Sequence, residues 1–280
     1  MSRHEIRSGE QSIDLDIEVH GQGRPVVLIH GWPLTSASWR PQVEALQGDY
    51  QVVTYDRRGF GASDRPASGY DYDTLADDLA GVLEELDLRD VTLVGFSMGG
   101  GEVARYVSRH GQDRLRSVVF VGAVTPYLRK TGDNPDGPLD DASFGQMRGQ
   151  LVDDRDAFFD DFVEKFYSVP KLLGLTSSLK VSEEQKGEAV AVCRQSDPTA
   201  ALACMDAWAG TDFRADLAQI TVPVLVVHGD GDQPVPFEGS GKRTHEALPH
   251  SELVLIEGAP HGLGVSHAEE LNAALRDFLA

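Results

Sequence analysis

The chain has little cysteine, no long apolar run and fewer basic than acidic residues. Its two cysteines, Cys193 and Cys204, are too few for a disulfide framework, and we interpret both as reduced residues of the core. No apolar run approaches the roughly 20 residues that a membrane-spanning helix needs. The first residues also lack the apolar segment of a signal peptide, so the sequence predicts a cytoplasmic protein that does not bind a membrane.

Charge and ligand spacing exclude two further kinds of partner. The chain carries 45 acidic and 25 basic residues, a formal net charge of −20, whereas binding to nucleic acid phosphates needs clustered lysine and arginine. Histidines and acidic residues are numerous, but none shows the H-x-x-x-H or C-x-x-C spacing of common metal sites. We therefore expect neither a nucleic acid partner nor a metal site.

The sequence does contain a regular alternation of strand and helix patterns. Apolar runs typical of buried strands alternate with amphipathic stretches over residues 1–125 and 218–280, which predicts an α/β core with a mostly parallel sheet covered on both faces. Residues 126–217 show helical spacing and no clear strand, so we interpret them as a helical cap insertion within a single structural domain. The expected strands cover residues 13–19, 26–29, 51–55, 91–94, 115–124, 222–228 and 253–256.

Local patterns predict where some of the helices begin. In the cap insertion, Ser182 followed by Gln185 has the pattern of a capping box. The closing helix is expected to begin at Ser266, with Glu269 three residues later.

The stretch Gly95-Phe96-Ser97-Met98-Gly99 follows the apolar run Val91–Val94 and precedes a helical pattern. It fits G-x-S-x-G, in which a serine is held on a strained turn between a strand and a helix. Side chains two positions either side of the serine would collide with neighbouring backbone, and only glycine lacks the Cβ. The bare pattern also occurs in ordinary glycine-rich turns, so the rest of the chain must supply an acid, a histidine and an oxyanion hole.

Loops after other predicted strands carry an acid and a histidine. Loops at the carboxyl ends of parallel strands share one edge of the sheet, where ligands bind. Ser97, Asp232 and His261 all lie on such loops, in the chain order serine, aspartate, histidine. We predict that Ser97 is the nucleophile, that His261 takes its proton, and that Asp232 fixes the tautomer of His261 and stabilises the imidazolium.

Other residues compete for the roles of acid and base. Asp230 lies close to Asp232, and either can be a turn aspartate bonded to its own backbone, but Asp232 lies further beyond the strand end. His30 and His228 end apolar strands and are interpreted as structural. His261 follows a late strand in a short loop rich in glycine and proline, which favours it as the base.

Two backbone N–H groups are candidates for the oxyanion hole that a tetrahedral intermediate needs. One belongs to Met98, at the predicted helix start, and the other to Trp32, after His30-Gly31. The Trp32 side chain is expected either to form a pocket wall or only to pack.

Five motifs together give the chain a specific family resemblance. They are Gly95-Phe96-Ser97-Met98-Gly99-Gly100, His30-Gly31-Trp32-Pro33, Asp56-Arg57-Arg58-Gly59-Phe60-Gly61, Gly229-Asp230-Gly231-Asp232 and Ala259-Pro260-His261-Gly262. Over nearly its whole length the chain resembles the cofactor-free haloperoxidase, or perhydrolase, and arylesterase branch of the α/β-hydrolases. The resemblance implies the α/β-hydrolase fold, with an eight-stranded, mostly parallel sheet flanked by helices and a helical cap, and a triad of Ser97, Asp232 and His261.

The resemblance also implies an activity. Members hydrolyse small carboxylic esters, aryl esters included, through an acyl-enzyme, and accept hydrogen peroxide in place of water to form peracids that oxidise halides. No haem, metal or other cofactor is implied, and the partners are a small ester or carboxylic acid with water or peroxide. Pro33 resembles the perhydrolase version of its loop. Relatives that act as γ-lactamases leave amide cleavage as an alternative, and members that form trimers or larger assemblies suggest a homo-oligomer.

The pocket walls implied by the resemblance come from the cap and from the loops at the sheet edge. Any of the cap aromatics can equally belong to the core. The expected wall residues are Trp32, Pro33, Phe96, Val124, Phe144, Phe158, Phe162, Trp208 and Val235.

A non-catalytic binding module on the same fold is the competing class of function. Such proteins usually lose a member of the triad. Ser97, Asp232 and His261 are all present, so the sequence favours an enzyme.

Overall fold

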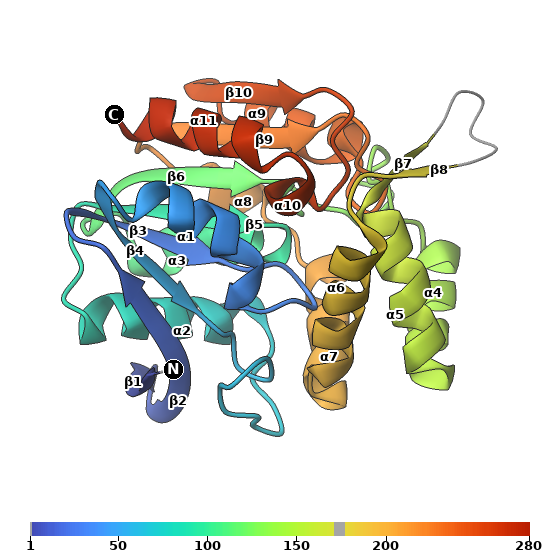
Figure 1. Cartoon of the computed structure of the whole chain (residues 1–280), viewed down its shortest axis with the longest axis horizontal. Coiled ribbons are helices and arrows are strands. Elements are labelled where there is room, and N and C mark those ends of the chain that lie inside the picture. Colours follow the sequence, from blue (N-terminus) through green and yellow to red (C-terminus); the bar gives the residue numbers. More distant parts are fainter. Residues whose placement is uncertain (1, 171–176) are drawn as a thin grey trace.

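An eight-stranded sheet runs through the computed structural model, which describes residues 2–170 and 177–280 (Figure 1). The strands lie in the order β1-β2-β4-β3-β5-β6-β9-β10. The β1–β2 and β2–β4 pairs are antiparallel and the remaining pairs are parallel, which confirms the predicted class and sheet. The strands are β1 (Ser2–Ser8), β2 (Gln11–His20), β3 (Arg24–Ile29), β4 (Tyr50–Tyr55), β5 (Val91–Phe96), β6 (Leu115–Val121), β9 (Val224–Gly229) and β10 (Ser251–Ile256).

The register of the parallel strands brings their carboxyl ends to one edge of the sheet. Ile29 of β3 pairs with Tyr55 of β4 and with Gly95 of β5. Further along the sheet, Val121 of β6 pairs with Val227 of β9. The loops that follow β3, β4, β5, β6, β9 and β10 therefore leave the sheet along one edge, which we call the rim.

Helices cover both faces of this sheet because each buries one apolar side (Figure 1). The helices α2, α3, α8 and α9 form one layer, and α1, α10 and α11 form the other. In α11, for example, Leu271, Leu275 and Leu279 are buried at helical spacing. The helices are α1 (Arg40–Leu46), α2 (Tyr72–Glu85), α3 (Met98–His110), α8 (Arg214–Leu217), α9 (Gly241–Ala247), α10 (Leu263–Ser266) and α11 (Ala268–Leu279).

The chain between β6 and β9 forms a group of helices beside the rim (Figure 1). We call residues 126–217, the range expected from the sequence, the cap segment; its last helix, α8, belongs to the layer that covers the sheet, and residues 171–176 lie outside the described residues. The base of the segment is closed by a hydrogen bond of 2.8 Å from the Phe213 backbone N–H to the Pro126 carbonyl oxygen. The helices beside the rim are α4 (Asp141–Asp153), α5 (Arg155–Phe166), α6 (Glu183–Gln195) and α7 (Pro198–Gly210).

Strands at the amino terminus and in the cap segment are not predicted by the sequence pattern. In β1 the only buried apolar residue is Ile6, so the strand lacks the apolar alternation that would reveal it. The cap segment contains a short antiparallel pair, β7 (Ser168–Pro170) and β8 (Ser177–Leu179), and is therefore not entirely helical. Strands of this length are too short for a periodic signal.

The two predicted helix starts have different outcomes. At α6 the capping box is confirmed, because the Ser182 and Gln185 side chains each bond the backbone N–H of the other residue. At the closing helix the prediction is wrong, because Ser266 is the last residue of α10 and its hydroxyl donates to the Gly262 carbonyl at 3.2 Å. The short helix α10 therefore precedes the closing helix, and the residue before α11 is His267.

Three findings concern cysteines, membranes and metals. Cys193 and Cys204 are free and buried, as predicted. None of the helices in residues 2–170 and 177–280 is both long and apolar enough to cross a membrane. Within the same described ranges, no group of three or more His, Cys, Asp or Glu side chains is arranged to hold a metal ion.

Candidate active site

Ser97 occupies the sharp turn between β5 and α3. Its φ of +54° and ψ of −117° lie outside the regions that L-residues ordinarily adopt, and such a conformation persists only where the surroundings enforce it. A Cβ on Gly95 would lie 2.5 Å from the Gly99 carbonyl oxygen, and a Cβ on Gly99 would lie 2.5 Å from the Ile29 carbonyl oxygen. The predicted steric need for both glycines is confirmed.

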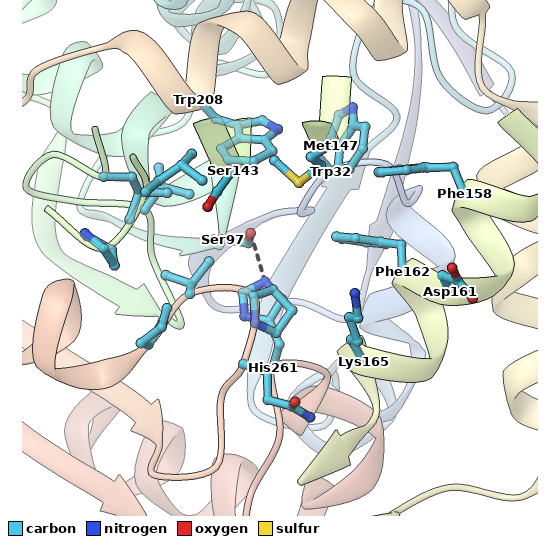
Figure 2. Close-up of a pocket in the computed structure, with 18 of the residues that line it drawn as sticks. Trp32, Ser97, Ser143, Met147, Phe158, Asp161, Phe162, Lys165, Trp208 and His261 are labelled. Atoms are coloured by element: carbon cyan, nitrogen blue, oxygen red, sulfur yellow. Dashed lines mark hydrogen bonds between the residues drawn. The ribbon is translucent and has the colours of Figure 1, made fainter. Parts of the chain in front are cut away.

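The structure brings Ser97, His261 and Asp232 together at the rim (Figure 2). His261 Nε2 lies 2.9 Å from Ser97 Oγ, and His261 Nδ1 lies 2.6 Å from Asp232 Oδ2. The three residues are buried, with at most 6% of each exposed. Because a carboxylate can only accept hydrogen bonds, His261 Nδ1 carries the ring hydrogen and donates to Asp232, and Nε2 is left to accept from the Ser97 hydroxyl.

Further hydrogen bonds orient the Asp232 carboxylate. The Val235 backbone N–H donates to Oδ1 at 2.8 Å, and His228 Nε2 lies 3.3 Å from Oδ2. Burial acts to raise the pKa of Asp232, but His261 and His228 outweigh it and hold this pKa below its ordinary value. Asp232 is therefore a carboxylate beside His261 at neutral pH.

Asp230, the alternative acid, contacts a different group. Its Oδ1 accepts a hydrogen bond of 2.6 Å from the Gly258 backbone N–H, and the residue is exposed. Asp230 thus stabilises the loop after β10, as a turn aspartate does. It is Asp232 that contacts His261.

His30 and His228 connect loops at the rim, as expected of structural residues. His30 Nε2 accepts the Arg57 backbone N–H at 2.9 Å. Burial and the Arg57 charge lower the pKa of His30 well below its ordinary value, so this ring is neutral. His228 Nε2 lies 2.8 Å from the Val235 carbonyl oxygen, and both histidines are fully buried.

Two backbone N–H groups beside Ser97 have no hydrogen-bond acceptor in the described part of the chain: those of Trp32 and Met98. Met98 is the first residue of α3, where N–H groups lack an intrahelical acceptor and the helix dipole favours negative charge. The Trp32 loop packs closely on the nucleophile, since a Cβ on Gly31 would lie 3.0 Å from the Ser97 Cβ. Donors placed in this way can stabilise a negative charge on an oxygen attached beside Ser97.

A cavity of about 340 Å³ adjoins Ser97 and His261. Figure 2 shows Trp32, Trp208 and Met147 on one side of it, and Phe158 and Phe162 of α5 on another. The apolar lining consists of Trp32, Val124, Leu128, Pro138, Leu139, Met147, Phe158, Phe162, Trp208, Pro234, Val235 and Pro236. Besides Ser97 and His261, the polar lining consists of Ser143, Gln146, Gln150, Asp161, Lys165 and Gln233.

Most of the expected wall residues line this cavity, and Pro33, Phe96 and Phe144 do not. Those that do are Trp32, Val124, Phe158, Phe162, Trp208 and Val235. Phe96 lies against His261 instead, with ring centroids 5.0 Å apart. Phe144 packs on Arg129, whose guanidinium carbon is 4.4 Å from the ring centroid, and Pro33 is buried within its loop.

The Trp32 side chain connects the rim to the cap segment. Its Nε1 donates to the Ala201 carbonyl of α7 at 2.9 Å. Its ring contacts Phe162 of α5, with centroids 5.2 Å apart, and Trp208 of α7, with centroids 5.9 Å apart. The ring is thereby held as a wall of the cavity.

Phe166 and Met147 belong to the site but are not identified by the sequence. The Phe166 ring meets the His261 ring edge to face, with centroids 4.9 Å apart. Its helical spacing with Phe158 and Phe162 was the available signal, because residues so spaced share one face of α5. Met147 of α4 lines the cavity, and nothing in its local pattern distinguishes it from a core residue.

Comparison with known proteins gives consistent results. A family model described as alpha/beta hydrolase fold matches residues 24–268. The chain is 42% identical over 262 residues to a non-heme chloroperoxidase from Kitasatospora aureofaciens, covering 92% of this chain and 93% of that one. It is 39% identical over 261 residues to a bifunctional esterase/perhydrolase from Acinetobacter calcoaceticus, covering 91% of each. Among solved structures, a bromoperoxidase from Bacillus anthracis matches with a TM-score of 0.93 and 49% identity, covering 99% of both chains.

Proposed function

Because this chain belongs to the alpha/beta hydrolase fold family, we propose that it is a serine hydrolase that cleaves small carboxylic esters, aryl esters among them. The observation that carries the proposal is the line of contacts from Ser97 Oγ to His261 Nε2, at 2.9 Å, and from His261 Nδ1 to Asp232 Oδ2, at 2.6 Å. This line ends at a cavity of about 340 Å³, large enough for a small ester.

In the first half of the reaction, Ser97 Oγ attacks the ester carbonyl carbon while His261 Nε2 takes the hydroxyl proton. The carbonyl oxygen becomes an oxyanion, which the backbone N–H groups of Trp32 and Met98 stabilise. The tetrahedral intermediate then collapses, the carbon–oxygen bond to the alcohol breaks, and the alcohol leaves with the proton from His261. Asp232 stabilises the imidazolium at each stage.

In the second half, a small nucleophile attacks the acyl group on Ser97 while His261 again takes a proton. Water gives the carboxylic acid, and hydrogen peroxide gives the peracid, with no change in the oxidation state of the protein. The named activities of the chloroperoxidase and esterase/perhydrolase relatives support peroxide as a second nucleophile. The reaction proceeds with groups supplied by the chain itself.

The lining of the cavity favours an ester with an apolar or aromatic part. Trp32, Phe158, Phe162 and Trp208 offer ring faces and edges to such a group. The polar residues in the lining are suited to the carboxylic acid or alcohol portion. Cytoplasmic location and a homo-oligomer stay predictions from the sequence and the family resemblance.

Replacement of the nucleophile tests the proposal. We expect Ser97→Ala to lower kcat for 4-nitrophenyl acetate by about 10⁴-fold or more, because no other group can form the acyl-enzyme. The same variant should lose peracid formation from acetate and hydrogen peroxide, measured by bromination of monochlorodimedone in bromide. A fluorophosphonate should label the wild type at Ser97 and leave the variant unlabelled, as read by mass spectrometry.

Ser251→Ala is the matched control, because Ser251 begins β10 at the end of the strand away from the rim. It should retain full rates in every assay. Unchanged ester cleavage by Ser97→Ala would contradict the proposed nucleophile. A folded wild type with no turnover of short aryl esters, lactams or acetate with peroxide would instead favour a binding module.

A further inference from the structure

A buried cluster of hydrogen bonds lies behind the oxyanion loop and is not used by the reaction steps above. Arg57, on the loop after β4, and Glu102, in the second turn of α3, are each at most 1% exposed. Arg57 Nε donates to Glu102 Oε1 at 2.5 Å, and Arg57 Nη2 also pairs with this oxygen. The other carboxylate oxygen, Oε2, accepts the Tyr55 hydroxyl at 3.1 Å.

The same guanidinium also holds the loop that carries Trp32. Arg57 Nη2 donates to the His30 carbonyl oxygen at 2.6 Å, and the Arg57 backbone N–H donates to His30 Nε2 at 2.9 Å. His30 Nδ1 therefore carries the ring hydrogen, and it lies 2.9 Å from the Gly31 carbonyl oxygen. One arginine thus fixes both the backbone and the ring of His30, just before Trp32 in the chain.

Glu102 fixes the other end of the cluster to the helix that carries Met98. Glu102 lies one helical turn after Met98 in α3, so a displacement of this first turn moves both residues together. The cluster therefore spans from the helix start that presents the Met98 N–H to the loop that presents the Trp32 N–H. Among residues 2–170 and 177–280, Arg57 is the side chain that bonds both Glu102 and the His30 carbonyl oxygen.

We propose that Arg57 is a positioning residue for the reaction, anchored by Glu102, and that it sets the separation of the two oxyanion donors, the backbone N–H groups of Trp32 and Met98. This inference rests on the proposed hydrolase function. Stabilisation of an oxyanion depends on donors held in place before charge develops, and a misplacement of about 1 Å can cost on the order of 10²-fold in rate. The planar guanidinium, with several donors in a fixed geometry, suits such a bridge, whereas the ammonium of lysine is a point donor.

Stability alone is a poor explanation for this pair. Removing two charges from water carries a large desolvation cost, and well-packed apolar residues in their place are often neutral or stabilising. Burial accordingly raises the pKa of Glu102 to about 7, although the neighbouring Arg57 charge opposes this shift. A positioning role explains why Arg57 and Glu102 are charged, because only their directional hydrogen bonds can hold the two donor groups in place.

The chain contains a closely matched control in the next residue. Arg58 is 5% exposed and bonds Asp78 of α2 through Nε, at 2.6 Å, and through Nη2, at 2.5 Å. It also donates to the Ser8 hydroxyl at the end of β1, at 3.1 Å, and within the described residues its side chain bonds neither the His30 loop nor α3. Arg58→Lys therefore repeats the change from Arg57→Lys in a buried pair that does not connect the oxyanion donors.

The test compares these two variants by kinetics on a short aryl ester. We expect Arg57→Lys to lower kcat by about 10- to 100-fold with KM within about twofold, because the loss concerns a charge that forms only in the transition state. An alkylboronic acid, whose tetrahedral adduct with Ser97 places a negative oxygen in the oxyanion hole, should bind more weakly by the same factor as kcat/KM falls. Arg58→Lys should change both quantities less than about threefold. Thermal unfolding of both variants measures the accompanying loss of stability.

A double variant keeps the proposal testable if Arg57→Lys does not fold. Arg57→Met combined with Glu102→Leu replaces the pair by apolar groups, and we expect a folded protein with the same loss of kcat and of boronate affinity. Equal kcat for Arg57→Lys and Arg58→Lys, or a loss of kcat without a loss of boronate affinity, would overturn the inference. A wild type that neither cleaves esters nor binds the boronate would instead overturn the proposed function, so the two failures are distinguishable.

Discussion

The rim and the cap segment both contribute to the site, but their side chains are held in different ways. At the rim, the Asp232 carboxylate contacts the Val235 backbone N–H, His261 and His228, and the Arg57–Glu102 pair is at most 1% exposed. In the cap segment, the ion pair between Arg148 and Asp206 is more than two-fifths exposed at both side chains, and such surface pairs contribute only about 0.2–1 kcal/mol. The cavity wall there includes the rings of Phe158 and Phe162, which stack with centroids 5.9 Å apart, and Phe162 also meets Trp32 of the rim.

The difference indicates that the rim determines the rate of the chemical step and that the cap segment determines which substrates bind. Directional bonds at the rim fix the reacting groups to within a fraction of an ångström, which the rate of the chemical step requires. Ring contacts in the cap segment fix the shape of the cavity without specifying an orientation so tightly. Changes at the rim should therefore act mainly on kcat, and changes in the cap segment mainly on KM and substrate choice.

The largest expected effect comes from neutralising the acid at the rim. Asp232→Asn should lower kcat by about 10³- to 10⁴-fold, because the amide can no longer hold His261 in the tautomer that accepts the Ser97 proton. Steady-state kinetics on 4-nitrophenyl acetate measures the loss. KM should change little.

Asp230→Asn is the matched control, since this residue lies on the same loop and its carboxylate accepts from the Gly258 backbone N–H, whereas that of Asp232 contacts His261. Its kcat should stay within about threefold of the wild type, because an exposed turn contact is worth little to the site. A large loss of kcat in Asp230→Asn, or a small loss of kcat in Asp232→Asn, would show that Asp232 is not the carboxylate that orients His261.

A smaller effect is expected from the cavity wall in the cap segment. Phe162→Ala removes the ring that meets Trp32 at 5.2 Å, and it should raise KM for an aryl ester by about tenfold through lost ring contacts. The kcat for a small methyl ester should stay within about twofold of the wild type. KM values for the two esters, measured side by side, give the selectivity change.

Phe144→Ala provides the control, because Phe144 packs on Arg129 and does not line the cavity. It should lower the melting temperature and leave both KM values unchanged. If Phe144→Ala raised KM for the aryl ester and Phe162→Ala did not, the assignment of the cavity wall would be wrong.

The smallest effect is expected from treating the native protein with iodoacetamide, which reacts with accessible thiols, because both cysteines of the cap segment are buried. Burial raises the pKa of Cys193 and of Cys204 to about 12, so at pH 8 only about 10⁻⁴ of either thiol is ionised. Iodoacetamide should leave both unmodified in the native protein, and raising the pH from about 7 to 9 should not change this, whereas ordinary thiols gain reactivity over that range. Labelling of both residues after denaturation, read by mass spectrometry, is the control. Rapid labelling of Cys193 in the native protein would mean that the cap segment opens. The cap segment would then differ from the rim in mobility as well as in the kind of contacts it makes.

Much of the rim can be predicted from the sequence because its motifs have local physical causes. The turn at Ser97 needs glycine at both flanking positions, and buried strands are marked by apolar runs whose ends must share one edge. These two constraints place Ser97, Asp232 and His261 on loops at the same edge of the sheet without knowledge of any contact. The residues nearest to chemistry are therefore the ones that the sequence indicates best.

The cap segment is less predictable because its inward faces depend on how helices pack. Phe144 and Met147 lie on one face of α4, yet the first packs on Arg129 and the second lines the cavity. The strands β7 and β8 are too short for a periodic signal. The pairing of Arg57 with Glu102 is unpredictable for a similar reason, since the two residues are 45 positions apart and only the completed sheet brings them together.

The hydrogen bond between Phe213 and Pro126 has a consequence for how new specificities arise. It joins the first residue of the cap segment to the residue before α8, so the chain leaves and re-enters the core at neighbouring points, and α8 packs on α3 before β9 begins. The pairing of β6 with β9 does not depend on what lies between these points, because insertions with adjacent ends disturb the surrounding fold little. We therefore expect that residues 126–213 can be exchanged as one unit with the matching segment of a relative, and that such chimeras keep the recipient's chemistry and take on the donor's selectivity.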